Sequence, residues 1–235
     1  MNRMKGNPIL FILSILSKFF VSFCGSWLMQ KLLIATTNAG KVREISALLG
    51  SLPYEVIGLS DLPVTPPPVP ETGTTFAANA ILKSEYYFAE TGVFALADDS
   101  GLEVDALNGA PGIYSARFAG EDASDADRVV KLLEELREVP EERRTARFVC
   151  AIALTGIVKG EVQTRVFEGF AEGLITRETR GTSGFGYDPI FYDKEMGRTF
   201  AELTREEKSA RSHRGKALAE AKEFLESLGM SGKVG

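Results

Sequence analysis

The sequence of 235 residues is poor in cysteine and histidine, with two cysteines and a single histidine. Cys24 and Cys150 lie far apart in the chain, and neither has the short spacing to other ligands that marks a metal site. Two isolated cysteines also provide no disulfide framework of the kind that holds small secreted domains together. The composition therefore argues against a disulfide-rich secreted protein and predicts a cytoplasmic one.

An excess of basic residues is also missing. The chain has 27 Lys and Arg against 32 Asp and Glu, which gives a formal net charge of −5 at pH 7. This balance gives no electrostatic reason to bind a nucleic acid polymer. A small anionic substrate stays possible, because it needs only a local basic patch and a metal ion. With 44% hydrophobic and 25% charged residues, the composition is that of a soluble globular protein with a sizeable core.

The first 28 residues differ from the rest of the chain. They contain the apolar runs Ile9–Leu16 and Phe19–Phe23, basic residues and no acidic residue. A signal peptide or a membrane anchor is one interpretation. Against it, Lys18 interrupts the apolar run, no Ala-x-Ala-like cleavage site follows, and Met29 leads with no linker into a strand-like run. We expect Met29 to be the natural start, with an upstream extension at 1–28 and a domain at 29–235 that associates with no membrane.

Short apolar runs alternate with amphipathic segments through the rest of the chain. Strand-like composition occurs at Lys31–Ala35, Val93–Ala97, Arg147–Leu154, Glu161–Ile175 and Ile190–Tyr192. Helical periodicity occurs over Val42–Leu49, from Thr74 or Thr75 to Ala89, from Ser124 to Leu136, and over Arg214–Leu228. Gly156 and Gly160 indicate a hairpin turn, and the proline-rich segment Leu62–Pro70 excludes a helix. Helices interleaved with strands and a hairpin predict an α/β fold with a mixed sheet.

The first candidate site is the loop between the first strand and the first helix. It comprises Thr36, Thr37, Asn38, Ala39, Gly40 and Lys41. A loop that opens a helix offers backbone N–H groups and the positive end of the helix dipole to an anion such as phosphate. Gly40 permits close approach of the backbone, and Lys41 adds a positive charge. The spacing is not that of a P-loop, and an ordinary turn with an N-terminal cap would have a similar sequence.

The second candidate site is the acidic cluster that begins with Asp98 and Asp99, at the expected end of a strand. Ligands of open α/β sheets bind at such ends. Adjacent residues of an extended chain point to opposite faces, so the two carboxylates should have different roles. Glu71 could supply a second oxygen ligand, and Mg²⁺ typically takes one or two carboxylates, with phosphates and water as its other ligands. A solvated Asp-Ser-Gly turn is the alternative.

Two further segments suit a nucleotide. The glycine-rich run Gly181–Pro189 contains Phe185 and Tyr187, which suggests a loop shaped around a flat group. Alternatively, both aromatic side chains pack into the core of a tight turn. The run Glu207–Arg214 concentrates lysine, arginine and the sole histidine in an otherwise acidic protein. Such a patch could bind phosphate or hydrogen-bond a base, or it could be the solvated start of the last helix.

These segments match a known family from Met29 to about Leu228. The chain resembles the inosine/xanthosine triphosphate pyrophosphatases through ATTNAGKVREI, ETGTTFAANAILK, ADDSGLEVDALNGAPGIYSARFAG, GTSGFGYDPIF and ELTREEKSARSHRGKAL, in the family's order. The resemblance implies a Mg²⁺-dependent enzyme that cleaves the purine nucleotides dITP, ITP or XTP between the α- and β-phosphates. It also implies a two-lobed α/β fold with a long mixed sheet, a cleft between the lobes, and a homodimer.

The resemblance also implies roles for single residues. Asp99 would be the general base and a Mg²⁺ ligand, and Glu71 the second ligand. The implied substrate contacts are Thr36, Thr37, Asn38, Ala39, Gly40, Lys41, Ser100, Phe185, Gly186, Tyr187, Asp188 and Lys208, with His213 and Arg214 near the base. Asp98 would shape the chain or support the site from behind.

Selectivity among purine nucleotides would depend on the hydrogen-bonding groups at the edge of the base. Arg214 donating to O6 and N7 would exclude adenine, which presents an amino group there. Guanine shares O6, and the sequence does not identify the residue that rejects its 2-amino group. Two other interpretations remain open. One is a related pyrophosphatase for modified pyrimidine or 7-methylguanine nucleotides, whose motifs differ from SHR and FGYDP. The other is a regulatory nucleotide-binding module, against which Glu71, Asp99 and Lys208 argue.

Overall fold

The computed structural model describes residues 29–231, so the interpretation of residues 1–28 lies outside the described part of the chain. The strands are β1 (Gln30–Ile34), β2 (Tyr54–Gly58), β3 (Phe94–Val104), β4 (Thr145–Val158), β5 (Glu161–Ile175), β6 (Phe191–Asp193) and β7 (Arg198–Thr199). The helices are α2 (Ala39–Leu49), α3 (Phe76–Thr91), α4 (Asp125–Glu135), α5 (Arg205–Arg211) and α6 (His213–Ser231). Short 3₁₀ helices, among them Gly112–Arg117 and Asp188–Ile190, lie in the connections.

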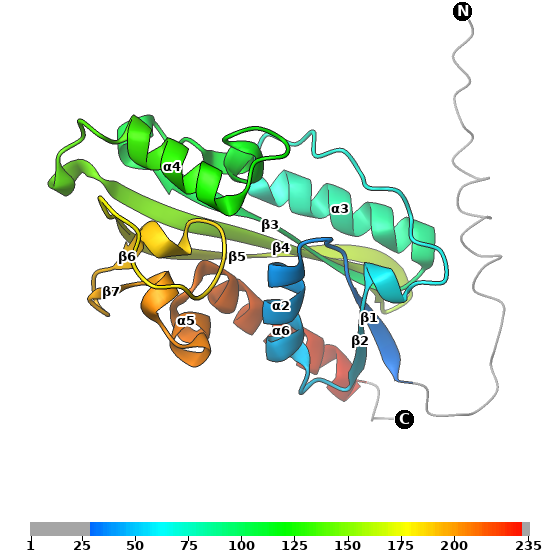
Figure 1. The fold of residues 1–235 in the computed structure, drawn as a ribbon. Helices are drawn as coiled ribbons and strands as arrows, with labels where there is room; N and C mark the ends of the chain where they lie inside the picture. The colour runs from blue at the N-terminus through cyan, green and yellow to red at the C-terminus, as the bar shows by residue number, and fades with distance from the viewer. Residues whose placement is uncertain (1–28, 232–235) are drawn as a thin grey trace, which may run out of the picture.

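The strands form one seven-stranded sheet in the order β2-β1-β3-β4-β5-β6-β7. β1 runs parallel to β2 and to β3, whereas each pairing from β3 to β7 is antiparallel. Helices cover both faces of the sheet: in Figure 1, α3 and α4 lie above it, and α2, α5 and α6 lie below it. The predicted α/β fold with a mixed sheet is therefore confirmed.

The hairpin of β4 and β5 is the longest feature of the sheet. Its register leaves only Lys159 and Gly160 as the turn. Both residues have positive φ, 53° and 84°, as a two-residue type I′ turn requires. The predicted hairpin is confirmed, but Gly156 lies inside β4 and not in the turn. A Cβ at Gly156 would stand 2.4 Å from the ring of Phe94, so this glycine makes room for an aromatic neighbour.

The strand that carries the acidic cluster is longer than the sequence predicts. The sequence predicts that it ends at Ala97, where the acidic cluster begins, yet β3 continues as a strand to Val104. β4 pairs with β3 along this whole stretch, and the hydrogen bonds keep the chain extended through the charged residues. β1, in contrast, pairs with β3 only as far as Leu96. The acidic residues therefore lie in the middle of a strand, beside the carboxyl end of its shorter neighbour, and the alternative of a solvated turn is wrong.

Three strands and helices have no counterpart in the predictions, namely β2, α5 and the two-residue strand β7. β2 is a five-residue edge strand with Glu55 and Gly58 among its residues, so its apolar signal is short. α5 has only seven residues and begins with a capping box, in which Thr204 and Glu207 accept from each other's backbone N–H groups. α6 follows almost at once, because Ser212 Oγ accepts from the N–H of Gly215 at 3.0 Å and so caps the next helix.

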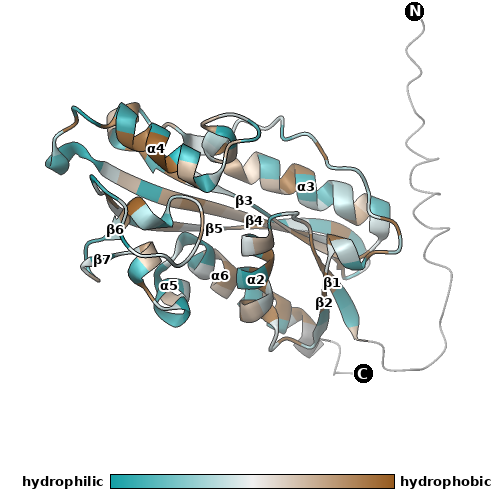
Figure 2. Ribbon diagram, in the orientation of Figure 1, coloured by the Kyte–Doolittle hydropathy of each residue, from teal (hydrophilic) through white to brown (hydrophobic). Residues whose placement is uncertain are grey.

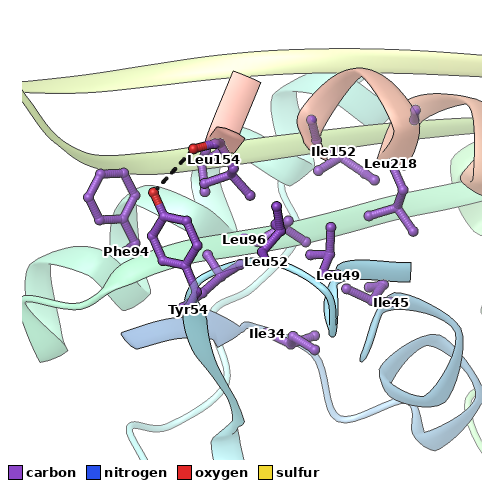
Figure 3. Close-up of a cluster of buried hydrophobic side chains, with 14 of the residues drawn as sticks. Ile34, Ile45, Leu49, Leu52, Tyr54, Phe94, Leu96, Ile152, Leu154 and Leu218 are labelled. Carbon is purple, nitrogen blue, oxygen red and sulfur yellow. Dashed lines mark hydrogen bonds between the residues drawn. The ribbon is translucent and has the colours of Figure 1, made fainter. Parts of the chain in front are cut away.

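The main core cluster lies between the sheet and the helices α2 and α6. Figure 3 shows Leu96 of β3 and Ile152 of β4 facing Ile45 and Leu218 from these helices. The dashed line in Figure 3 marks the bond that Tyr54 Oη donates to the backbone oxygen of Leu225, at 3.4 Å. Burying such side chains stabilises the fold by roughly 1.5–3 kcal/mol each. This core fixes α2 and α6 against the strands that carry the acidic cluster.

The helices above the sheet are amphipathic. Figure 2 shows brown and teal residues side by side on α4, whose buried side chains are Val129 and Leu132. Ser124 caps this helix in a capping box with Asp127, and Thr75 caps α3 by accepting from the N–H of Ala78, as predicted for one of two threonines. Within residues 29–231, no helix is both long and apolar enough to cross a membrane.

Candidate active site

A cavity of about 370 Å³ opens where β1 ends beside the middle of β3. Most of the predicted site residues line it: Thr36, Thr37, Asn38, Lys41, Glu71, Asp99, Ser100, Phe185, Gly186, Tyr187, Asp188, Lys208, His213 and Arg214. Ala39 and Gly40 do not line this cavity; Gly40 lines a neighbouring one of about 380 Å³, which shares Phe185, Lys208 and Arg214 with the first. Segments that are far apart in the sequence thus meet around one space.

The loop between β1 and α2 is a capped helix start. Asn38 Oδ1 accepts from the N–H groups of Gly40 at 2.9 Å and Lys41 at 3.1 Å. The cap thus uses two of the backbone N–H groups that could face an anion, and in this respect the loop has the capped turn given as the alternative. Gly40 is needed for a different neighbour, since a Cβ there would stand 2.8 Å from the ring of Phe185. The loop therefore faces the cavity chiefly with its side chains.

The two adjacent acids point to opposite faces of the sheet, as predicted. Asp98 faces α2 and α6, and its side chain is closed off from solvent. It accepts from Arg214 Nε at 2.9 Å and pairs with Lys41. Burial alone would raise the pKa of Asp98, but the positive charges of Arg214 and Lys41 outweigh burial and hold the pKa well below its usual range. Asp98 is therefore a permanently ionised group inside the protein.

Asp99 faces α3 instead and lies within reach of Glu71. Asn79 Nδ2 donates to Asp99 Oδ2 at 3.2 Å, and Lys83 Nζ lies 3.2 Å from Asp99 Oδ1. Burial raises the pKa of Asp99, and the charge of Lys83 offsets this only in part. Burial also acts to raise the pKa of Glu71, but there the charges of Lys83, Lys41 and Arg117 together outweigh burial, and the pKa is lowered. The two carboxylates thus differ in proton affinity although they share one cation.

Lys83 is a functional candidate that the sequence reasoning missed. Its ammonium group donates to Glu71 Oε1 at 2.8 Å and to the backbone oxygen of Asp98 at 2.9 Å, besides its contact with Asp99. Burial would lower the pKa of Lys83, but the carboxylates of Asp99 and Glu71 raise it. The available signal was its spacing: Asn79 and Lys83 are four residues apart, so both project from one face of α3.

The carboxylate pair fits a divalent cation. An ammonium group bridges Glu71 and Asp99, which shows that the two side chains are arranged to share one positive charge. Among residues 29–231, no group of three or more His, Cys, Asp and Glu side chains comes together as a metal cage. A pair of carboxylates without further protein ligands suits Mg²⁺, which commonly takes its other oxygens from water and substrate phosphates.

The glycine-rich loop is held by a buried carboxylate. Asp188 Oδ2 accepts from the N–H of Phe185 at 2.8 Å and from Lys208 Nζ at 2.6 Å. Burial raises the pKa of Asp188, against the opposing charge of Lys208. Gly184 has φ of 81°, and a Cβ there would stand 2.1 Å from the Asp188 carboxylate, so the turn requires glycine. This local network fixes the backbone that presents Phe185.

The two aromatic residues of this loop have different environments. Tyr187 is buried and donates from its hydroxyl to the backbone oxygen of Ser115 at 3.0 Å, as the core interpretation predicted for it. Phe185 is only partly buried, and its ring lies beside two cations, with Lys208 Nζ 5.0 Å and Arg214 Cζ 5.6 Å from the ring centroid. Phe185 is therefore the ring on which a flat group in the cavity would stack.

The basic patch is buried, so the solvated-helix interpretation is wrong. Lys208, His213 and Arg214 are all buried at the junction of α5 and α6. Glu44 of α2 accepts from Lys208 Nζ at 2.9 Å and from Arg214 Nη1 at 2.5 Å. This glutamate was also missed, because its partners lie more than 160 residues away in the chain. Glu44 thereby connects Lys208 and Arg214 to α2, the helix that follows the candidate phosphate loop.

His213 is held in its neutral form. Its ring stacks on Phe148 with the centroids 4.6 Å apart. Burial, together with the positive charge of Arg214, lowers the pKa of His213 well below its ordinary value. Within the described residues, His213 Nδ1 is the buried side-chain nitrogen or oxygen atom that has no hydrogen-bond partner. A buried polar atom without a partner beside a cavity is a candidate contact for a ligand.

Comparison with known proteins decides the family. The sequence pattern of the Ham1 family matches residues 32–224, which make up most of the chain.

The chain belongs to the Ham1 family.

Curated relatives of this Ham1 protein carry the name dITP/XTP pyrophosphatase. The one from Shigella flexneri is 53% identical over 190 residues, which cover 81% of this chain and 95% of the relative. The one from Exiguobacterium sibiricum is 54% identical over 189 residues, 80% of this chain and 93% of the relative. The family resemblance seen in the sequence motifs is thereby confirmed.

Solved structures of the family share the fold. The HAM1 protein of Coxiella burnetii is 44% identical, with a TM-score of 0.76 over 85% of this chain and 100% of that one. The dITP/XTP pyrophosphatase of Mycobacterium abscessus is 47% identical, with a TM-score of 0.66 over 82% of this chain and 98% of that one. Both sequence and fold therefore agree on a Ham1 protein.

Proposed function

We propose that this Ham1 protein hydrolyses dITP, ITP and XTP to the monophosphate and pyrophosphate, and so keeps these bases out of DNA and RNA. One observation carries the proposal. A single cavity has paired carboxylates under a lysine in one part of its lining, and an aromatic ring with a buried arginine in another. These are the parts needed for the triphosphate and the purine of one nucleotide. The pyrophosphatase names of the relatives support it.

Glu71 and Asp99 would hold Mg²⁺ together with oxygens of the triphosphate. When bound, Mg²⁺ would neutralise the negative charge of the phosphates, which otherwise repels the oxygen of the attacking water. Lys83 and Lys41 add positive charge on the protein's side of the same cavity. Thr36, Thr37 and Asn38 line the wall next to Lys41 and would contact the phosphates through their side chains.

Asp99 is the candidate general base. It must be ionised to accept a proton from the water that attacks the α-phosphorus, and a raised pKa makes it a better proton acceptor than an ordinary aspartate. Asn79 and Lys83 orient its two oxygens. Glu71, with a lowered pKa, stays ionised and suits the role of a pure ligand.

The purine would lie against Phe185, with Arg214 and His213 at its edge. Arg214 stays protonated, because burial lowers its pKa less than the charges of Asp98 and Glu44 raise it. A permanent donor matches the O6 and N7 acceptors of hypoxanthine and xanthine and mismatches the amino group of adenine. Sites built on such hydrogen bonds reject the wrong analogue by roughly 10⁴–10⁵-fold.

We also infer how the molecule is organised around this cavity. Lining residues come from α5 and α6 on one side of the sheet and from α3 and α4 on the other, which supports a cleft between two lobes. A neighbouring hollow shares Glu71 and Ile113 with this cavity and includes Tyr114 and Phe170, which are 56% and 44% exposed. Such rings in a hollow support a homodimer. A nucleotide substrate and the free thiol of Cys150 support a cytoplasmic location.

The test is pyrophosphate release from dITP, ITP, XTP, ATP and GTP, with and without Mg²⁺. We expect rapid release from the first three nucleotides only, and only with the metal. Equal rates on ATP and ITP would refute the selectivity. In the same assay, Asp99→Asn should abolish turnover while ITP still binds, because the amide cannot accept the proton. Near-normal turnover of this variant would reject Asp99 as the base, and ITP binding by a wild type without turnover would favour the regulatory module.

A further inference from the structure

Asp98 lies behind the cavity and not in it. Its side chain has no exposed surface, and Asp98 is absent from the cavity lining although the next two residues, Asp99 and Ser100, belong to it. Four polar groups surround its two carboxylate oxygens. Oδ1 accepts from Ser100 Oγ at 3.0 Å and pairs with Lys41 Nζ. Oδ2 accepts from Arg214 Nε at 2.9 Å and from Cys150 Sγ at 3.1 Å.

Three of these four partners face the cavity. Lys41 comes from α2, Ser100 from β3 and Arg214 from α6, so one carboxylate joins three elements. Arg214 also donates from Nη2 to Ser100 Oγ at 2.8 Å, which closes a ring of contacts around Asp98. Lys41 and Arg214 repel each other, and the charge of Asp98 between them permits both cations to face the same space. The fourth partner, Cys150, does not line the cavity.

Only an acceptor fits this position. The Lys41 ammonium and the Arg214 guanidinium are donors only, and the Ser100 hydroxyl and the Cys150 thiol donate here. An ionised carboxylate accepts on both oxygens and donates on neither, whereas the amide of asparagine must direct an NH₂ group at one pair of donors. Replacing the carboxylate by an amide of nearly equal shape would therefore turn two attractive contacts into repulsive ones.

We propose that Asp98 is a positioning residue that sets Lys41, Ser100 and Arg214 for substrate, and thereby links recognition of the purine to recognition of the phosphates. The inference rests on the proposed function of the cavity. A positioning role and a purely structural role predict different kinetics for the enzyme molecules that fold. A structural role changes how much enzyme is active, whereas a positioning role changes KM and the preference for ITP over ATP.

The experiment compares Asp98→Asn, Asp98→Glu and wild type by pyrophosphate release with ITP and with ATP, alongside thermal unfolding. Asp98→Asn should raise KM for ITP about tenfold to hundredfold, in line with losing bonds to charged groups, and lower the ratio of kcat/KM for ITP to that for ATP. Asp98→Glu keeps an acceptor-only group but shifts it by one methylene, so the same two quantities should change by less. If Asp98→Asn yields no folded enzyme, Asp98→Glu carries the test.

Asp193 provides a matched control. It is also a buried aspartate paired with an arginine, because it accepts from Arg211 Nε at 2.5 Å, but it lines no part of the cavity. Asp193→Asn should lower the unfolding temperature and leave KM and the ITP preference unchanged. Wild-type KM and preference in every Asp98 variant that folds would overturn the positioning role. A wild-type enzyme that releases no pyrophosphate from ITP would instead refute the proposed function on which this role depends.

Discussion

At the scale of single residues, the carboxylate pair of Glu71 and Asp99 depends on Lys83. The ammonium group lies 2.8 Å from a Glu71 oxygen and 3.2 Å from an Asp99 oxygen, and without it the buried carboxylate of Asp99 would face the partly buried one of Glu71. Like charges at such a distance raise the pKa of one partner. Lys83 therefore keeps both groups ionised in the free protein and also occupies space that a metal ion would share.

Lys83→Met should lower kcat on ITP by about 10²–10³-fold, as losses of single electrostatic groups in active sites do. The same variant should bind Mg²⁺ more tightly when no nucleotide is present, because no ammonium competes for the carboxylates. Steady-state kinetics and titration calorimetry with magnesium chloride measure the two effects. Lys131→Met is the control, since Lys131 contacts the backbone oxygen of Phe118 outside the cavity. An unchanged kcat would show that Lys83 is only a structural counter-ion.

The pKa of His213, the sole histidine of the chain, predicts how the stability of the folded protein depends on pH. Its folded pKa lies well below the ordinary value of 6.5, through burial and the charge of Arg214; Lys208 and Lys41 act in the same direction, and Asp98 opposes them. Below pH 6.5 the unfolded chain therefore binds a proton that the folded chain does not. The sign follows: stability falls as the pH decreases below 6.5, by at most about 1.4 kcal/mol per pH unit.

His213→Gln should remove this contribution. Urea unfolding at pH 5, 6, 7 and 8 would show a steeper loss of stability on acidification in the wild type than in the variant, and the difference should vanish above pH 7. Other titrating groups are common to both proteins, so they cancel in the comparison. Parallel stability curves for the two proteins would show that His213 accepts a proton inside the fold.

At the scale of elements, the contact between β5 and α6 decides where the basic patch lies. A Cβ at Gly169 of β5 would stand 2.1 Å from the backbone oxygen of His213 and 2.8 Å from the nitrogen of Ala217. No flexible side chain can yield there, because both atoms belong to the backbone of α6. The start of α6 therefore lies directly on the strand, and His213 and Arg214 are placed with it.

Gly169→Ala should destabilise the protein by about 1–3 kcal/mol, the usual cost of overpacking, and raise KM for ITP as the start of α6 shifts. Chemical unfolding and steady-state kinetics measure both. Gly58→Ala is a suitable control, since Gly58 has an extended backbone and a Cβ there would meet its nearest neighbour at an ordinary 3.5 Å. Equal effects of the two substitutions would contradict a special role for this contact.

The sequence predicts elements that carry their own signals and misses those that depend on partners. The helix starts at Thr75 and Ser124 and the hairpin turn at Gly160 are local patterns, and the structure has all three. The continuation of β3 past Ala97 depends on pairing with β4, which begins more than 40 residues later. The roles of Asp98 and Lys83 likewise depend on groups from other elements. The spacing of Asn79 and Lys83 places both on one face of α3, but it does not show which carboxylates that face meets.

At the scale of the whole molecule, the hollow of about 890 Å³ around Phe170 is the candidate dimer surface. Phe170→Glu should weaken self-association by about 30-fold, equivalent to about 2 kcal/mol for a central aromatic contact. Sedimentation at several protein concentrations measures it. Val162→Glu is the matched control, because Val162 is exposed on the same strand but outside the hollow. A wild type that sediments as a monomer at all concentrations would contradict the dimer.

The alternation of Asp98 and Asp99 on β3 has a consequence for how this chain can change over generations. Successive side chains of a strand point to opposite faces of the sheet. The face on which each acid lies therefore depends on whether its position in the strand is even or odd. Inserting or deleting one residue between Ala95 and Asp98, with the pairing of Ala95 to β4 kept, would turn Asp98 toward α3 and Asp99, the candidate base, toward α2. Point substitutions can adjust this stretch one contact at a time. A change of length by one residue exchanges both halves of the site at once, so the length of this stretch is constrained more strictly than its composition.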